Sequence, residues 1–401
     1  MSSFQNLMTP DVRANPYTLY AELREKPVCQ VDPGGMWAVS RYQDVVAVLR
    51  DPVRFSSAGL AMSFRPPWLE RNPTAESLVM KDPPEHTRLR GFVSRAFSTP
   101  ALALLEPKIR AIAEDLAERA AEKQEIDFMA DFALPLPARV LSLVFGLDQT
   151  AYPRLKVWAD DLLSIPGGHQ TPERQEAIRE SLAAMERHFN ELLAKRSEAP
   201  RNDLVSDLLR AEQEGQTTRQ ETMSFLFGIV PAGLETTVYL LGNTMTTLAQ
   251  HPKEMAQVLA DLSLIPKLTE EMLRFEPPAH TSLRLVTEDV ELSGVTIPKG
   301  SVVVVLLASA LRDERQYPDA DRFLLDRNKP ISISFGHGVH HCIGAALARL
   351  EARLGLEALF SRIKGFTLAT REIPWCRSLI ARGPTSLPMH LESRSVGAPR
   401  A

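Results

Sequence analysis

The stretch SFGHGVHHCIG, residues 334–344, decides how the rest of the chain is interpreted. It places three glycines, three histidines and a cysteine directly before AALARLEARLGLEALF (345–360), which has the composition of a helix. Glycine lets the backbone adopt positive φ and approach a flat ligand closely. Cys342 would lie at the start of the helix, where backbone N–H groups and the helix dipole favour a thiolate. The segment therefore indicates a bound ligand.

Several interpretations of this segment compete. A zinc site would use His337, His340, His341 and Cys342, but three adjacent side chains rarely converge on one tetrahedral ion. A reactive nucleophile, or a merely buried cysteine, leaves the glycines unexplained. A thiolate held by backbone donors as an axial haem ligand accounts for the cysteine and the glycines together.

Composition excludes several classes of protein. The 401 residues carry 46 basic and 50 acidic side chains, a net charge of −4, so nothing favours binding to nucleic acid. Three widely spaced cysteines do not form a disulfide framework and are typical of a reducing cytoplasm. We see no signal peptide, and the longest apolar run, 302–308, is far below the ~20 residues of a spanning helix. We expect a cytoplasmic protein with no membrane segment.

Hydrophobic periodicity predicts a mainly α protein with a small β region, an α+β fold. Apolar residues recur at helical spacing over 101–124 and 178–196, and 225–251 reads as a long core helix. Strand-like patterns cover 35–40, 289–306 and 386–392. Without a linker or repeat, 1–401 is expected to be a single domain. Its β subdomain would come mainly from the first ~60 residues and 289–306, and 393–401 would be a flexible tail.

The spacing Phe335-x-x-Gly338-x-x-x-Cys342-x-Gly344 resembles the haem-binding signature of the cytochromes P-450. The resemblance implies haem b as cofactor and Cys342 as the proximal iron ligand. It also implies a long central I helix over the haem and a Cys-ligand loop before the L helix. The cofactor-binding residues that it implies, four of them basic partners of the haem propionates, are His86, Arg90, Arg284 and His340, together with Ala232, Gly233, Phe335, Gly336, Cys342 and Gly344.

The segment 225–251 carries polar and flexible residues that a core helix does not need. Gly233, Glu235 and Thr236 lie at its centre, although glycine and β-branched threonine weaken helices and buried polar groups need partners. This stretch resembles the P-450 I helix, which implies that Ala232-Gly233 open a groove for dioxygen. Thr236 would contact dioxygen and Glu235 would relay protons, so both are candidate catalytic residues. Pro231 departs from the family pattern.

A further motif, Glu271-x-x-Arg274, places a carboxylate and a guanidinium one turn apart on a helix. By resemblance this pair belongs to the K helix and is completed by Arg322 from "YPDADRF". The role that the resemblance implies for the three residues is structural.

The resemblance implies a monooxygenase that inserts one atom of dioxygen into a C–H or C=C bond of a hydrophobic small molecule. Candidate substrates are secondary metabolites, terpenoids, macrolides and fatty acids. A hydrogen-peroxide-dependent peroxygenase and a non-catalytic haem gas sensor are the alternatives. The pocket would be formed by segments 58–82 and 162–180 and by the substrate-binding candidates Pro231, Ala232, His280, Leu283, Ile380 and Ala381.

No glycine fingerprint for flavin or nicotinamide occurs, so electrons must come from another protein. The resemblance implies a ferredoxin and a flavin-dependent ferredoxin reductase as partners of a monomer. Candidate docking residues are Arg88, Arg95, Arg349 and Arg353.

Overall fold

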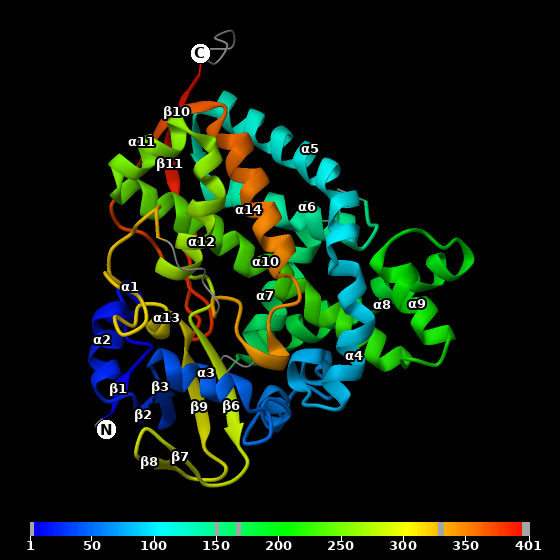
Figure 1. Ribbon diagram of the computed structural model, residues 1–401. Helices are drawn as coiled ribbons and strands as arrows, with labels where there is room; N and C mark the ends of the chain where they lie inside the picture. The colour runs from blue at the N-terminus through cyan, green and yellow to red at the C-terminus, as the bar shows by residue number, and fades with distance from the viewer. Residues whose placement is uncertain (1–3, 149–151, 166–169, 328–332, 395–401) are drawn as a thin grey trace.

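The longest helix in the described part of the chain, α10 (Arg219–Gln250), crosses the middle of the molecule (Figure 1). It begins with a capping box in which Thr218 and Glu221 exchange side chain–backbone hydrogen bonds. By length and composition α10 could span a membrane, but 61% of its most apolar stretch is buried inside the protein. The core helix predicted over 225–251 is confirmed.

The structure is a computed structural model that describes residues 4–148, 152–165, 170–327 and 333–394, with residues 62–64 described by backbone only. Helices cluster around α10 and make up most of the molecule (Figure 1). The other α-helices are α1 (Pro10–Ala14), α2 (Tyr17–Glu25), α3 (Tyr42–Arg50), α4 (Glu85–Val93), α5 (Thr99–Lys123), α6 (Pro135–Val144), α7 (Tyr152–Ser164), α8 (Pro172–Glu198), α9 (Leu204–Gln213), α11 (Pro252–Ala260), α12 (Ile265–Phe275), α13 (Leu307–Ala310) and α14 (Ala345–Phe360).

The main sheet has six strands in the order β1-β2-β3-β9-β6-β4 and lies beside α2 and α3 (Figure 1). Its central strand β9 is a run of valines that pairs with β3 in parallel and with β6 in antiparallel orientation, and its buried pattern suits that position. The six strands are β1 (Gln5–Asn6), β2 (Val28–Asp32), β3 (Met36–Val39), β4 (Phe55–Ser56), β6 (Thr281–Val286) and β9 (Val302–Leu306).

Two smaller sheets complete the β structure. β7 (Val290–Leu292) and β8 (Val295–Ile297) form a hairpin. β11 (Pro388–Ser393) pairs with β10 (Ile363–Leu368) on one side and with β5 (Glu125–Asp127) on the other. These two sheets lie at opposite ends of the molecule (Figure 1).

The strands predicted over 35–40, 289–306 and 386–392 are present. The strand β6 was missed, because the sequence TSLRLV carries no regular alternation. The predicted tail starts too early, since Ser393 still belongs to β11 and Arg394 donates hydrogen bonds to the Ile363 and Leu259 carbonyls. The rest of that tail, 395–401, lies outside the described residues.

The loop that precedes α14 is held by the packing of α14 itself and by a short turn within the loop. The helix α14 packs against α5, α12 and α10, and the short turn before it, η9 (Gly338–His340), packs against α3. The loop is thus held between the helical body and the sheet region, facing α10.

Candidate active site

A cavity of about 440 Å³ lies between the middle of α10 and the loop before α14. Most of its lining side chains are apolar. The exposed side chain of Cys342 opens into this cavity. The size is that of a site for a cofactor or a small ligand. The cavity also brings Thr236 and Cys342, which lie more than one hundred residues apart, to the same enclosed space.

The cysteine loop is held by the backbone. The Cys342 N–H donates to the Phe335 carbonyl at 2.8 Å, which closes the loop on itself. Gly338 has φ +70°, and a Cβ there would lie 2.4 Å from the Leu49 carbonyl oxygen, so only glycine fits against α3. The Arg349 guanidinium lies 4.5 Å from the centre of the Phe335 ring and covers it.

Burial raises the pKa of the Cys342 thiol, and it outweighs the Gly344 backbone N–H and the charges of Arg90 and Arg349, which lower it. The Gly344 N–H thus acts in the direction expected for the start of a helix, but it does not offset burial. A bound metal cation would supply further positive charge, since metal binding deprotonates a thiol.

The three histidines of the loop point to different partners. His337 Nε2 lies 2.7 Å from the Arg50 Nε, and His340 stacks on His86 with ring centres 4.3 Å apart. The His341 ring lies near Phe335 instead. Within the described residues no three His, Cys, Asp or Glu side chains gather to hold a metal ion, so the geometry does not support the zinc interpretation.

Four basic groups gather beside the cavity, as predicted for propionate partners. Both ring nitrogens of the buried His86 and the Nε2 of His340 have no hydrogen-bond partner in the structure. Burial, followed by the charges of Arg284, His86 and Arg90, lowers the pKa of His340 to about 3. Burial also lowers the pKa of Arg284 to about 10. Two arginines beside buried imidazole nitrogens that have no hydrogen-bond partner would suit an anion, and the two carboxylates of a haem fit this arrangement.

The central turns of α10 face the cavity with small and hydroxyl side chains. Ala232, Gly233, Thr236 and Thr237 all line it. The Thr236 hydroxyl donates to the Ala232 carbonyl at 3.0 Å. The residues for which a groove was predicted therefore line the same cavity as Cys342.

Pro231 and Glu235 lie on a different face of α10 and do not line the cavity. The Glu235 carboxylate instead accepts a hydrogen bond from the Tyr239 hydroxyl at 2.8 Å. The predicted substrate contact of Pro231 is therefore corrected. α10 remains helical through Pro231.

The other predicted substrate residues divide into two groups. Leu283 and Ile380 line the cavity, whereas Ala381 and His280 do not. The buried His280 ring has its Nδ1 3.3 Å from the Tyr20 hydroxyl and its Nε2 3.7 Å from a Glu276 oxygen. The prediction that His280 orients a substrate is wrong, because the ring belongs to a separate polar cluster.

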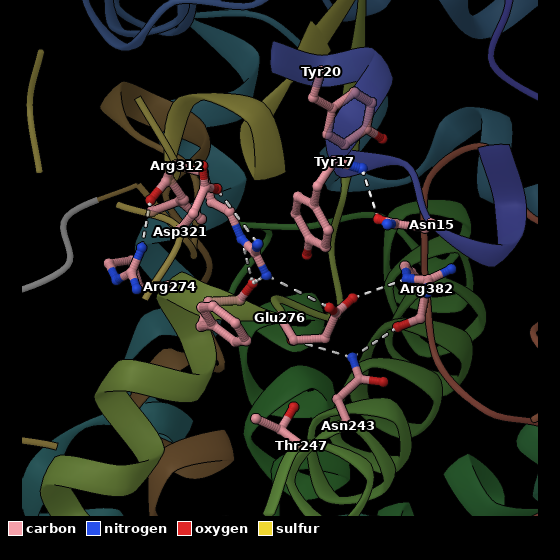
Figure 2. A network of polar contacts seen from close by, with 12 residues as sticks. Asn15, Tyr17, Tyr20, Asn243, Thr247, Arg274, Glu276, Arg312, Asp321 and Arg382 are labelled. Carbon is pink, nitrogen blue, oxygen red and sulfur yellow. Dashed lines mark hydrogen bonds and ion pairs between the residues drawn. The ribbon is translucent and has the colours of Figure 1, made fainter. Parts of the chain in front are cut away.

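That cluster is built around Glu276 at the end of α12 (Figure 2). Arg382 donates to its carboxylate at 2.8 Å, and Asn243 from α10 donates to the backbone carbonyls of Glu276 and Arg382. Arg312 lies 3.5 Å from the centre of the Tyr17 ring. The cluster joins α2, α10 and α12 to the loop around Arg382 and is structural.

The predicted partner of Glu271 and Arg274 requires a correction. Arg274 holds Glu271 through two hydrogen bonds of 2.7 and 2.9 Å, as predicted. The side chain of Arg322 is 67% exposed and, among the residues that the structure describes, forms an ion pair with Asp319 at 3.9 Å instead of with Glu271. Arg327 completes the cluster, with its Nε 3.1 Å from Glu271, and Arg322 contributes only its backbone carbonyl.

Of the two segments predicted to form the pocket, 58–82 lines the cavity and the described part of 162–180 does not. Segment 58–82 forms the short helices η1 (Ala58–Phe64), η2 (Pro73–Glu76) and η3 (Leu78–Met80), and supplies Leu60, Val79 and Met80 to the cavity. Segment 162–180 holds the end of α7 and the start of α8, and none of its described residues lines the cavity.

Three of the four predicted docking arginines form ion pairs. Arg88 pairs with Glu221, Arg349 with Glu270 and Arg353 with Glu106. Arg95 is exposed and has no partner among the described residues. Most of this charge is therefore balanced within the protein.

Glu351 is a site residue that the sequence interpretation missed. It lines the cavity from α14 and is 2% exposed, and its Oε2 has no hydrogen-bond partner. Burial raises its pKa well above the usual range of a carboxyl group. Its position on the buried face of the "LARLEARLG" helix was the available signal.

A cysteine-bearing loop, a helix that faces it across the cavity and a cluster of basic groups with unpartnered imidazole nitrogens fit a haem-thiolate site. Comparison with known proteins agrees. Residues 155–374 match the family model described as "Cytochrome P450". The mycinamicin IV hydroxylase/epoxidase of Micromonospora griseorubida is 37% identical over 92% of this chain and 94% of its own. The 6-deoxyerythronolide B hydroxylase of Saccharopolyspora erythraea is 33% identical over 98% and 100%.

Solved structures show the same fold. The cytochrome P450 CYP109Q5 from Chondromyces apiculatus is 38% identical and superimposes with a TM-score of 0.88 over 97% of this chain and 98% of its own. The chain belongs to the cytochrome P450 family and has its fold. It is accordingly an oxidoreductase, a haem monooxygenase of the bacterial type.

Proposed function

We propose that this monooxygenase inserts one oxygen atom into a C–H or C=C bond of an uncharged, largely apolar small molecule, such as a secondary metabolite of the macrolide or terpenoid kind. The observation that carries this proposal is the lining of the cavity. Most of its described side chains are apolar, among them Leu60, Val79, Ile229, Leu283 and Ile380. Two relatives whose names specify a hydroxylase and an epoxidase act within the same reaction class.

A free fatty acid fits this lining less well than a neutral molecule. The arginine that lines the cavity among the described residues, Arg284, lies near His340 and His86, which are proposed to face the propionates. A carboxylate bound deep among the apolar residues would lack a partner, which is costly. A substrate with hydroxyl or carbonyl groups could instead pair with Thr236 or Thr237.

The residues that would hold the cofactor, proposed as haem b, are Cys342 at the iron and the basic cluster at the propionates. When bound, the haem supplies the activation of dioxygen by two electrons. Ala232 and Gly233 are proposed to leave room for dioxygen. The Thr236 hydroxyl, which donates to the Ala232 carbonyl in this structure, would turn to donate a hydrogen bond into the cavity. Glu235, on the adjacent face of α10, is the acid proposed to resupply protons.

Electrons are proposed to arrive from a ferredoxin and a flavin-dependent ferredoxin reductase. The exposed Arg95, in the short turn that follows α4, is a candidate contact, together with Arg349 and Arg353 if their ion pairs rearrange. We further propose a cytoplasmic monomer that folds as a single domain over 1–401.

A spectral screen tests the substrate class. Neutral terpenoids and macrolide lactones should shift the haem absorption to the high-spin form, and should bind more tightly than fatty acids of matched length. Product formation with NADPH, ferredoxin and reductase then identifies the bond attacked. Exclusive binding of fatty acids, with their carboxylate required, would contradict the proposal. Ile380→Glu, which puts a charge into the lining, should weaken neutral ligands and serves as the matched variant.

A further inference from the structure

Glu235 and Thr236 are neighbours in α10, but their side chains point to different environments. Successive residues on an α-helix lie about 100° apart, so Thr236 faces the cavity while Glu235 faces away from it. Glu235 shares its face with Tyr239, four residues later. The Tyr239 hydroxyl donates to the Glu235 Oε1 at 2.8 Å. The acid of the proposed relay therefore has a defined partner outside the cavity.

Tyr239 is fixed independently of Glu235. Its ring is 9% exposed and packs against the backbone at Gly383, where a Cβ would lie 2.2 Å from the ring carbons. No side chain other than hydrogen fits at Gly383 without moving the ring. The hydroxyl also interacts with the Cys376 thiol, which itself donates to the Ala381 carbonyl at 3.3 Å. The hydroxyl is therefore a preorganised donor whose position does not depend on the carboxylate.

The charges around Glu235 give this donor a specific effect. Burial raises the pKa of Glu235, and the Tyr239 hydrogen bond is the strongest influence in the opposite direction. From α7, Lys156 lowers the pKa more weakly and Asp160 raises it, and these two residues pair with each other. Burial and the neighbouring Glu235 raise the pKa of Tyr239 itself, so its hydroxyl keeps its proton. Tyr239 thus stabilises the carboxylate form of Glu235.

We propose that Tyr239 is a positioning residue for proton delivery: its hydroxyl holds the Glu235 carboxyl on the outer face of α10 and stabilises the carboxylate that remains after Glu235 has given up its proton. The proton passes from the Glu235 oxygen toward the cavity at Thr236, and a proton from solvent restores the acid. Tyr239 keeps its own proton throughout. This inference rests on the proposed role of Glu235.

The test uses Tyr239→Phe, which removes the hydroxyl but keeps the ring against Gly383. The first readout is the infrared C=O band of the protonated Glu235 carboxyl in the resting ferric protein, assigned by its loss in Glu235→Gln. In Tyr239→Phe this band should persist to higher pH than in the wild type. The second readout is the fraction of NADPH electrons recovered in product, which should fall about five- to tenfold, the size of one lost hydrogen bond.

Two controls separate positioning from general damage. Tyr317→Phe removes the hydroxyl of another buried tyrosine, which packs near Tyr42 and Arg274, and should change neither readout. In a Glu235→Gln background, Tyr239→Phe should cause no further loss of product. An unchanged infrared titration in Tyr239→Phe, or an additional loss in the double variant, would overturn the proposal.

The product yield of the Glu235→Gln single variant distinguishes the proposed role of Glu235 from the inference about Tyr239. If Glu235→Gln retained full product yield, the proposed role of Glu235 would fail, and the proposed positioning role of Tyr239 would fail with it. If Glu235→Gln lost product while Tyr239→Phe behaved as the wild type in both readouts, only the inference about Tyr239 would be overturned.

Discussion

Replacing Arg327 should destabilise the protein and reduce its haem content, whereas replacing Arg322 should not. Arg327 is 9% exposed in its side chain, and its Nε lies 3.1 Å from a Glu271 oxygen. It also donates to the carbonyls of Pro318 and Asp319 at 2.6 and 2.9 Å. The Arg327→Met variant would remove one charge from a buried cluster and leave both carbonyls without this donor.

The expected loss of unfolding free energy depends on the contacts that Glu271 keeps in Arg327→Met. Losing one partner of a buried ion pair costs about 3–5 kcal/mol. Glu271 keeps its two hydrogen bonds from Arg274, so we expect the lower end, about 3 kcal/mol in the free energy of unfolding. Arg322→Met is the matched control, because that side chain is 67% exposed, and it should stay within about 0.5 kcal/mol of the wild type.

The assay is denaturant unfolding of the haem-bound protein, together with the ratio of haem to protein after purification. Arg327→Met should unfold at lower denaturant concentration and carry less haem. Equal effects of the two substitutions, or a larger one at Arg322, would refute the assignment of Arg327 as the third member of the cluster.

Three further predictions concern single side chains. Thr236→Ala should still consume NADPH but release hydrogen peroxide, with product yield reduced roughly 10²-fold; full coupling would show that protons reach the cavity without this hydroxyl. Glu351→Gln should gain stability over the wild type as pH rises above about 4.5, because burial raises the pKa of Glu351 and its ionisation favours the unfolded chain; parallel stability curves of the two proteins would contradict this. His280→Phe should lower the thermal midpoint but leave ligand affinity in spectral titrations unchanged, since the ring contacts Tyr20 and Glu276; an altered affinity would return His280 to the cavity.

The acid stability of the protein should reflect the same cluster. Burial lowers the pKa of His280 to about 4, so as pH falls from about 6.5 toward 4 the unfolded chain takes up this proton first. Stability should therefore decline over that interval. In His280→Phe, equilibrium unfolding between these pH values should show a shallower decline, and an equally steep one would assign it to other groups.

Local signals accounted for what the sequence predicted well. The cysteine loop could be predicted because its glycines lie within a few residues of Cys342 at a recognisable spacing. Gly338 packs closely against α3, where a larger residue would not fit. The core helix α10 carries a long apolar stretch, which the sequence shows directly. Ala232 and Gly233, which belong to the same stretch, line the cavity.

The predictions that failed concern side chains whose direction, into the protein or out of it, the local sequence does not determine. Arg322 and Arg327 lie five residues apart in an irregular segment, and spacing alone does not say which one turns inward. His280 directly precedes β6, and its ring points to Tyr20 instead of the cavity. Such choices depend on packing between segments that are distant in sequence.

The central claim is that Cys342 binds the haem iron as a thiolate. The most direct measurement is the absorption spectrum of the reduced protein with carbon monoxide, for the wild type and for Cys342→His. The wild type should give the red-shifted Soret band of thiolate-ligated haem, and Cys342→His should lose it. A wild-type band at the position of histidine-ligated haem, or a red-shifted band that survives in Cys342→His, would contradict the account.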